Sequence, residues 1–242
     1  TQKIFFSILL ALLFNISAFA GWVITSEIDE GIDNPKTEIT YIQDNKIKTA
    51  TDEEISIFNL ETNHLFLINP EKKSYWAGTL DDLKSEVIEG MKTKMDMSLA
   101  NLPEEHKEMF KQKYQEMIDK VEKGQANHAE NIKLKKTDES INILNRSADK
   151  YQFYKDETLR EDVWITTDID IYNELNIQEF KKFFTNFSNV SGYNAIENTP
   201  QFLELIEKGY PIKTIQYYEN FKIITTAKNI QKKQIPESEF TV

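Results

Sequence analysis

The chain has 242 residues, of which 29 are lysine or arginine and 40 are aspartate or glutamate, so its formal net charge is −11. An acidic chain is repelled by phosphate backbones and anionic headgroups, which disfavours nucleic acid and anionic membrane surfaces as partners. The sequence contains no cysteine, and this excludes disulfides and thiolate metal sites. With 12% aromatic residues and only 7 glycines, the chain can bury a substantial core.

The N-terminal segment has the composition of an export signal. Lys3 precedes an apolar run over residues 4–14, which correspond to the charged and hydrophobic regions of a signal peptide. A retained membrane helix would need roughly 20 apolar residues. The run breaks at Asn15 after far fewer, which favours a cleavable signal over an anchor.

The cleavage site is indicated by small residues. Ala18 and Ala20 stand three positions and one position before the bond to Gly21, and this spacing suits signal peptidase. We expect residues 1–20 to be removed as a signal peptide. Residues 21–242 are then expected to act as one domain in the periplasm, without an integral membrane anchor.

The first part of the mature chain, up to Thr79, has the pattern of β-strands. Apolar and polar residues alternate in the segments 22–28, 39–41 and 47–49, which is typical of half-buried antiparallel strands. Residues 55–60 and 65–68 are apolar on both faces, which predicts central strands covered on both sides. A turn then leads to a short strand at 74–76.

Helical spacing replaces the strand pattern after Thr79. The apolar residues of the first predicted helix are Leu80, Leu83, Val87, Met91 and Met95. A second amphipathic helix is predicted after Pro103, which suits a first helical turn, and it should stop at Gly124. We therefore predict a helical insertion over residues 80–124 between two blocks of strands.

The rest of the chain mixes both patterns. Residues 125–138 are polar and are predicted to form an irregular connection. Strands are expected at 141–144, 151–154 and 163–167, and a closing hairpin at 212–218 and 221–227. Between them, one helix is predicted around the stripe Phe180, Phe183, Phe184 and Phe187, and another with Thr199 as its N-cap and Pro200 as its first residue.

This order of elements predicts an α+β fold. A large, mostly antiparallel sheet should curl as it twists, and the amphipathic helices need a surface for their apolar faces. We expect the helices to cover the concave face of this curved, unclosed sheet.

Several segments resemble a known family. They are the turn Asn-Pro-Glu-Lys-Lys-Ser-Tyr at 69–75, Leu-Pro-Glu-Glu at 102–105, Gly-Tyr-Pro-Ile at 209–212 and Ile-Pro-Glu-Ser-Glu-Phe at 235–240. Together with the order of elements, they resemble an uncharacterised periplasmic domain family related to the lipoprotein carriers LolA and LolB. The resemblance covers the mature chain.

The resemblance implies an unclosed β-barrel with helices over its mouth, an apolar concave cavity and no catalytic residues. LolA and LolB carry acylated lipoproteins, so the implied partner is an apolar ligand or a lipoprotein. No position of this chain matches the functional residues of the carriers, and no residue role is therefore carried over.

The motifs of common enzymes are absent from the sequence. His64, His106 and His128 form no His-x-x-x-His pair, and neither a Gly-x-Ser-x-Gly turn nor a glycine-rich phosphate loop occurs. Zinc sites and common nucleophilic triads are thus unsupported. We expect no cofactor, no metal and no catalytic residue.

Two weaker alternatives come from residue clusters. The five methionines are all in the predicted helices, namely Met91, Met95, Met97, Met109 and Met117, and thioethers can bind Cu(I). Carboxylates such as Asp168 and Asp170 leave a hydrolase open, although their spacing indicates no glycosidase pair.

The leading hypothesis is a non-enzymatic periplasmic protein that binds an acyl chain, a lipid or the lipid part of a lipoprotein. The candidate ligand contacts are Met91, Met95, Phe180, Phe183, Phe184 and Phe187. Core packing is the simpler interpretation of the phenylalanine stripe. The alternative hypothesis is an envelope protein-interaction module whose own side chains fill the cavity.

Overall fold

The computed structural model describes residues 20–124, 131–191, 196 and 199–242. Eleven strands form one sheet, in which each neighbouring pair is antiparallel. They are β1 (Gly21–Asp29), β2 (Lys36–Gln43), β3 (Lys46–Ala50), β4 (Ile55–Asn59), β5 (His64–Asn69), β6 (Ser74–Thr79), β7 (Ile132–Ile143), β8 (Arg146–Lys155), β9 (Thr158–Thr166), β10 (Tyr210–Tyr217) and β11 (Lys222–Lys233).

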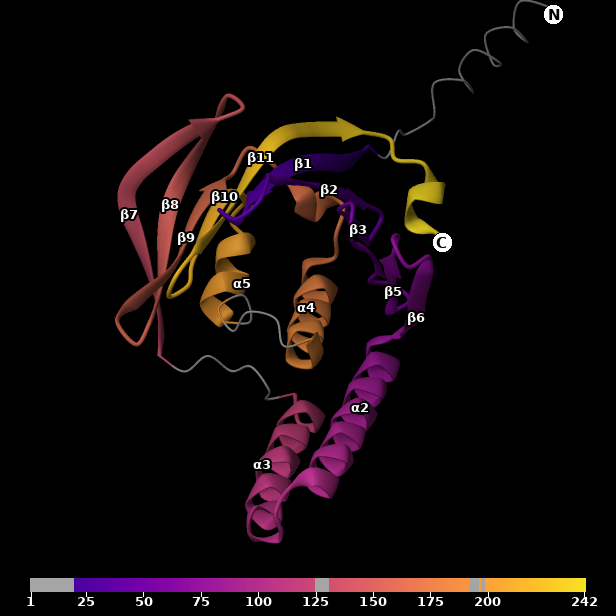
Figure 1. Ribbon diagram of the computed structural model, residues 1–242. Coiled ribbons are helices and arrows are strands. Elements are labelled where there is room, and N and C mark those ends of the chain that lie inside the picture. Colours follow the sequence, from indigo (N-terminus) through magenta and orange to yellow (C-terminus); the bar gives the residue numbers. More distant parts are fainter. Residues whose placement is uncertain (1–19, 125–130, 192–195, 197–198) are drawn as a thin grey trace, which may run out of the picture.

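The sheet is curved and unclosed. Its strand order is β6-β5-β4-β3-β2-β1-β11-β10-β9-β8-β7, so that β6 and β7 are the two edges. Figure 1 shows the strands forming an arch over α4 and α5. The predicted α+β class with a large, curved, antiparallel sheet is confirmed.

Tight turns set the register of several hairpins. Asp44 and Asn45 have φ angles of 49° and 59° in the turn between β2 and β3. Positive φ at both turn residues gives the hairpin geometry that matches strand twist, and Asn and Asp tolerate it best. The turn between β7 and β8 has the same geometry at Leu144 and Asn145, with φ angles of 55° and 60°.

The first and last strands meet in the middle of the sheet. β1 pairs with β2 on one side and with β11 on the other, from Gly21 opposite Lys233 to Asp29 opposite Ile224. β11 thus runs beyond Ala227, where the predicted strand stopped. β4 and β5 are covered on both faces, as predicted, but they lie near the β6 edge and are not central strands.

The prediction of an irregular connection over residues 125–138 is wrong for its second part. Residues 132–138 belong to β7, while residues 125–130 lie outside the described part of the chain. β7 carries Lys133, Lys135 and Lys136 on an edge. Charged residues protect a sheet edge against pairing with other chains, and they also weaken the apolar alternation by which a strand is recognised.

Four α-helices and two short 3-10 helices complete the described structure. They are α2 (Leu80–Asn101), α3 (Glu104–Glu122), η1 (Ile171–Asn173), α4 (Ile177–Ser191), α5 (Pro200–Ile206) and η2 (Glu237–Phe240). The N-cap predicted at Thr199 is confirmed, and the structure shows a second cap, at Thr79, that was not predicted. The Thr79 and Asp82 side chains form a capping box at the start of α2, and the Thr199 hydroxyl accepts a hydrogen bond from the Phe202 N–H at the start of α5.

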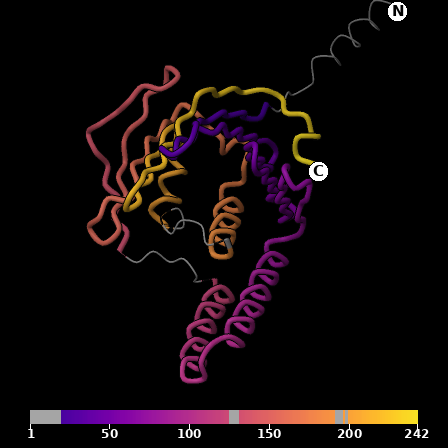
Figure 2. Tube along the Cα trace, in the orientation of Figure 1, coloured from indigo at the N-terminus to yellow at the C-terminus, as the bar shows by residue number. Residues whose placement is uncertain are grey.

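The helices divide into two groups. α4 and α5 lie on the concave side of the sheet, whereas α2 and α3 pack against each other and extend away from it as an arm (Figure 2). Among the helices of the described residues, none is long and apolar enough to cross a membrane.

The core has a layer on each side of the sheet. The larger layer includes Trp22 and Ile42 from the strands and Phe183 from α4. On the opposite face, Val23 and Ile57 are covered by Ile235 and by Phe240 of η2. The C-terminal segment therefore shields the outer face of the first strands.

Candidate functional site

The start of α4 is fixed by two asparagines. The Oδ1 atom of Asn176 accepts hydrogen bonds from the N–H groups of Gln178 (3.1 Å) and Glu179 (3.3 Å), and so caps the helix. Asn45 accepts a hydrogen bond from the Asn176 N–H through its Oδ1 atom (2.6 Å) and donates its own N–H to the Glu174 carbonyl (2.8 Å). The turn between β2 and β3 therefore determines where α4 begins.

The phenylalanines of α4 have two different environments. Phe183 is 7% exposed, and its ring meets Phe58 of β4 edge to face, with the centroids 5.0 Å apart. Phe187 also meets Phe58, at 5.5 Å, while Phe180 and Phe184 stack on each other at 5.8 Å. Phe180, Phe184 and Phe187 remain half-buried, so only Phe183 is a fully covered core residue.

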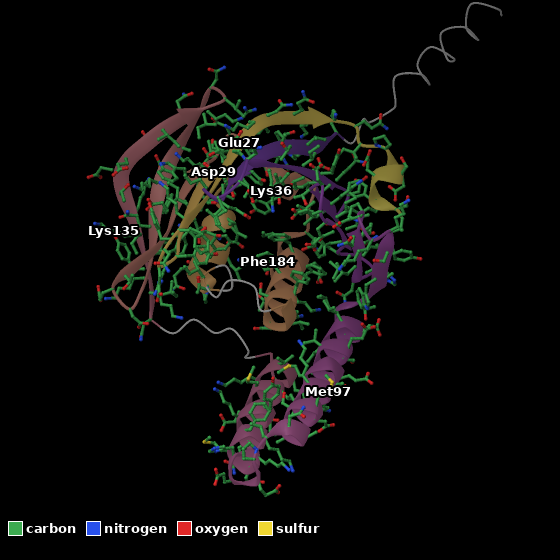
Figure 3. All side chains as sticks on the ribbon, viewed as in Figure 1. Glu27, Asp29, Lys36, Met97, Lys135 and Phe184 are labelled. Atoms are coloured by element: carbon green, nitrogen blue, oxygen red, sulfur yellow. The ribbon has the colours of Figure 1, made fainter. Side chains whose placement is uncertain are left out.

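A groove of about 470 Å³ lies between α4, α5 and the concave face of the sheet. Six phenylalanines line it, namely Phe58, Phe180, Phe183, Phe184, Phe187 and Phe202. Figure 3 shows the labelled Phe184 on α4 beneath the arch of the sheet. The volume is within the range of about 300–1,000 Å³ that is typical of small-molecule sites.

The polar residues of the groove are acidic or uncharged. Glu38 of β2, Glu54, Tyr172 of η1 and Tyr210 of β10 line it. Burial raises the pKa of Glu38 above its ordinary value. Burial also raises the pKa of Tyr210, and the negative charge of Glu38 adds to this effect. Both side chains line the groove, and burial favours the protonated form of each.

The structure brings together only some of the residues expected to contact a ligand. Phe180, Phe183, Phe184 and Phe187 all line the groove. Met91 and Met95 do not, because they lie on α2 in the arm. A ligand contact by the two methionines stays a prediction, and it has no support from this arrangement.

The predicted cleavage site is only partly within the described structure. Ala18 lies outside the described residues, Ala20 precedes β1, and Gly21 is the first residue of β1. A Cβ atom on Gly21 would lie 2.4 Å from the Ile42 carbonyl oxygen, so the close approach of β2 requires a glycine here. Cleavage after Ala20 stays a prediction.

Sequence reasoning missed the groove residues contributed by the strands. A signal for Glu38 was present, since Glu38, Thr40 and Ile42 alternate along β2 and Ile42 is buried in the core. Residues two apart on a strand share a face, so this alternation could have placed Glu38 on the inner face of the sheet, but the prediction used only Ile39 and Tyr41. Tyr210 and Phe202 come from elements whose position next to α4 depends on the tertiary fold.

Other hollows are more polar or more open. One of about 440 Å³ lies between the base of the arm and α4, and it is lined by both Lys84 and Lys182 and by Asp81 and Glu179. In the part of the chain that the structure describes, no cluster of three or more histidine, aspartate or glutamate residues has the arrangement of a metal site. The groove beneath the arch is therefore the best candidate site.

Comparisons with known proteins give a family but no function. The model of the family described as "Domain of unknown function (DUF4412)" matches residues 81–242. Among curated proteins, none matches the chain.

Solved structures with some similarity have very different sequences. PNGF-II is 12% identical, with a TM-score of 0.40, and the match covers 92% of this chain but only 30% of PNGF-II. An uncharacterized conserved protein from Thermus thermophilus is 6% identical, with a TM-score of 0.43, and the match covers 97% of this chain and 90% of that protein. A LolA superfamily protein from Nitrosomonas europaea is 8% identical, with a TM-score of 0.28, and the match covers 94% of this chain and 92% of that protein. All three TM-scores are below 0.5, so these structures do not establish a relation to LolA and LolB. That relation stays a prediction.

Proposed function

This chain belongs to the DUF4412 family, a domain of unknown function, and we propose that it is a non-enzymatic periplasmic protein that binds an apolar ligand in the groove between α4 and α5. The ligand is an acyl chain, a lipid or the lipid part of a lipoprotein. One observation carries the proposal: Phe180, Phe184 and Phe187 are half-buried and face a hollow instead of a closed core. Such a lining favours an apolar ligand.

Burial alone can supply the affinity for such a ligand. Each methylene group removed from water contributes about 0.8 kcal/mol, so a chain of several methylenes needs no strong polar contact. The aromatic residues come from β4, α4 and α5, so a ligand in the groove would be held between the sheet and both helices.

The polar groups of the groove support binding without chemistry. Its potential general bases are Glu38 and Glu54, and its potential nucleophiles include the hydroxyls of Thr49 and Ser56. Across the described residues, neither carboxylate forms a hydrogen bond with either hydroxyl. An activated hydroxyl needs a base within hydrogen-bond reach, so the arrangement offers no prepared nucleophile.

A groove-filling substitution tests the proposal. Ser56 lies on the floor of the groove in β4, and Ser56→Phe should fill part of its volume. We expect the wild-type chain to bind an environment-sensitive apolar dye with increased fluorescence, and Ser56→Phe to lower the affinity about tenfold or more, which corresponds to about 1.4 kcal/mol. The matched control is Ser147→Phe, at an exposed position of β8 outside the groove.

Two outcomes contradict the proposal. Either the wild type does not bind the dye, or Ser56→Phe and Ser147→Phe bind it with equal affinity. Thermal unfolding of each variant verifies that it is folded. Native mass spectrometry of protein purified without detergent, followed by lipid extraction, supplies the second test. A stoichiometric apolar ligand would support the proposal.

A second candidate function rests on the arm. Met97, Met109 and Met117 on α2 and α3 are 58%, 69% and 45% exposed, and exposed methionines are common on adaptable protein-binding surfaces. This observation favours an envelope protein-interaction module. A groove that takes up neither dye nor lipid, combined with capture of one defined envelope protein that Met109→Lys abolishes, would favour this function over ligand binding.

A further inference from the structure

The groove is acidic as well as apolar. Its lining includes the carboxylates of Glu38 and Glu54 and, within the described residues, no lysine, arginine or histidine. Two lysines on elements that line the groove are paired with other carboxylates. Lys36 of β2 pairs with Glu53, with 3.0 Å between Nζ and Oε2, and Lys181 of α4 pairs with Glu207.

Neither groove carboxylate has a basic partner in the described part of the chain. The Glu38 side chain forms no hydrogen bond or ion pair there. Glu54 forms hydrogen bonds only through its backbone, in a turn with Thr51. Glu38 is half-buried, and burial raises its pKa. A carboxylate without a cation costs free energy in such a place, and a bound cation would remove this cost.

Glu38 lines the groove together with two tyrosines, Tyr172 and Tyr210. The negative charge of Glu38 adds to the effect of burial in raising the pKa of the Tyr210 phenol. The hydroxyls of Tyr172 and Tyr210 form no hydrogen bond with a described residue. Three polar groups therefore border the same hollow as the phenylalanines and are available to a ligand.

The aromatic side chains favour the same kind of ligand. The face of an aromatic ring carries negative potential, which attracts ammonium groups within about 6 Å of the ring centroid. The groove thus combines two carboxylates with a wall of phenylalanines and tyrosines. A carboxylate, sulfate or phosphate headgroup would meet repulsion from Glu38 and Glu54 and would find no basic residue in the lining.

We propose that the groove selects amphiphiles with a cationic, amine-bearing headgroup, which lies at Glu38 while the apolar chain contacts the phenylalanines of α4. This inference rests on the proposed function and names the class of ligand. The headgroup is a primary or quaternary ammonium ion.

Three probes with the same dodecyl chain test the inference. They are dodecyltrimethylammonium, the uncharged tetraethylene glycol monododecyl ether and the anion dodecanoate, each below its micelle concentration at moderate salt, with binding measured by calorimetry. We expect the cation to bind about tenfold more tightly than the uncharged probe, because the carboxylates and rings attract it. The anion should bind most weakly.

The net charge of the chain requires a matched control, since a charge of −11 attracts any cation. The double variant Glu38→Gln and Glu54→Gln should abolish the preference for the cation, measured as the ratio of its affinity to that of the uncharged probe in the same variant. The control Glu86→Gln and Glu108→Gln removes the same charge from exposed positions on the arm. It should keep the preference. Thermal unfolding verifies that both double variants are folded.

The outcomes separate the two proposals. Binding of the uncharged probe without a preference for the cation contradicts the inference about the headgroup and leaves the proposed function standing. If the groove and arm double variants lose the preference for the cation equally, the preference comes from surface charge. This result also contradicts the inference. Failure of all three probes to bind the wild type contradicts the proposed function itself.

Discussion

Gln43 of β2 exchanges two hydrogen bonds with the backbone of Ile235, which lies 192 positions further along the chain. Its Nε2 atom donates to the Ile235 carbonyl oxygen (3.3 Å), and its Oε1 atom accepts from the Ile235 N–H (2.9 Å). Both residues are buried. This pair attaches the C-terminal segment to the outer face of the sheet, where it covers Val23 and Ile57.

Gln43→Met should therefore destabilise the fold. The methionine has a similar shape but leaves the N–H and carbonyl groups of Ile235 buried without partners, which costs about 1–3 kcal/mol. Urea denaturation measures the free energy of unfolding. The control is Gln231→Met at an exposed position of β11, and a Gln43→Met variant as stable as this control would show that the attachment is unimportant.

Phe183→Ala should cost more stability than any other truncation in the phenylalanine stripe. The ring is 7% exposed and packs edge to face on Phe58, and removal of a buried phenylalanine ring costs about 3–5 kcal/mol. Phe184→Ala should cost roughly 1–2 kcal/mol, because its ring is only half-buried and faces the groove. Denaturation midpoints and slopes compare the two variants, and equal losses would contradict the division into core and groove residues.

Local patterns predicted the elements that carry their own signal. The spacing of Phe180, Phe183, Phe184 and Phe187 gave α4, and Thr199 with Pro200 gave the start of α5. The lysines of β7 concealed half of that strand, because an exposed edge strand needs few apolar residues. A pattern that lies within one element can be read from sequence.

Relations between distant elements could not be predicted. The stripe that contains Met91 and Met95 indicates an amphipathic helix, but the same stripe suits packing on α3 as well as on the sheet. The groove likewise joins Glu38 of β2 with Tyr210 of β10, and no local periodicity links positions so far apart. The candidate site was thus predictable on α4, whereas on the strands the sequence indicated at most the face on which Glu38 lies.

Lys150 of β8 and Asp162 of β9 form a buried ion pair, with 3.3 Å between Nζ and Oδ2. Their side chains are 11% and 4% exposed. Asp162 also accepts hydrogen bonds from Gln152 (3.0 Å) and Tyr217 (2.9 Å). Burial alone would lower the pKa of Lys150, but hydrogen bonds to Glu139 and Asp162 outweigh it and raise that pKa.

Lys150→Met should cost about 3–5 kcal/mol, because it leaves the Asp162 carboxylate buried without a cation. The double variant Lys150→Met and Asp162→Asn should recover at least about half of this loss, since the amide keeps an acceptor oxygen and carries no charge. A double-mutant cycle of unfolding free energies measures the coupling. Additive losses would show that the two charges do not depend on each other.

Glu38→Gln should stabilise the protein at neutral pH, in contrast to the other substitutions. Burial raises the pKa of Glu38 in the folded state, so its ionised form is disfavoured by folding and the unfolding free energy falls as pH rises through that pKa. The advantage of Glu38→Gln should be present at about pH 7 and shrink toward zero near pH 4, where the wild-type carboxyl becomes protonated.

Urea denaturation of wild type and Glu38→Gln at both pH values measures this difference, and the exposed change Glu108→Gln corrects for the altered net charge. A variant less stable than the wild type at neutral pH, or a difference that does not change with pH, would contradict the assignment of Glu38 to a desolvated position. A groove residue that costs stability is typical of a position retained for function. If Glu38→Gln is more stable than the wild type and binds the cationic probe more weakly, Glu38 belongs to the ligand site. If the variant loses both stability and affinity for this probe, Glu38 is a structural residue.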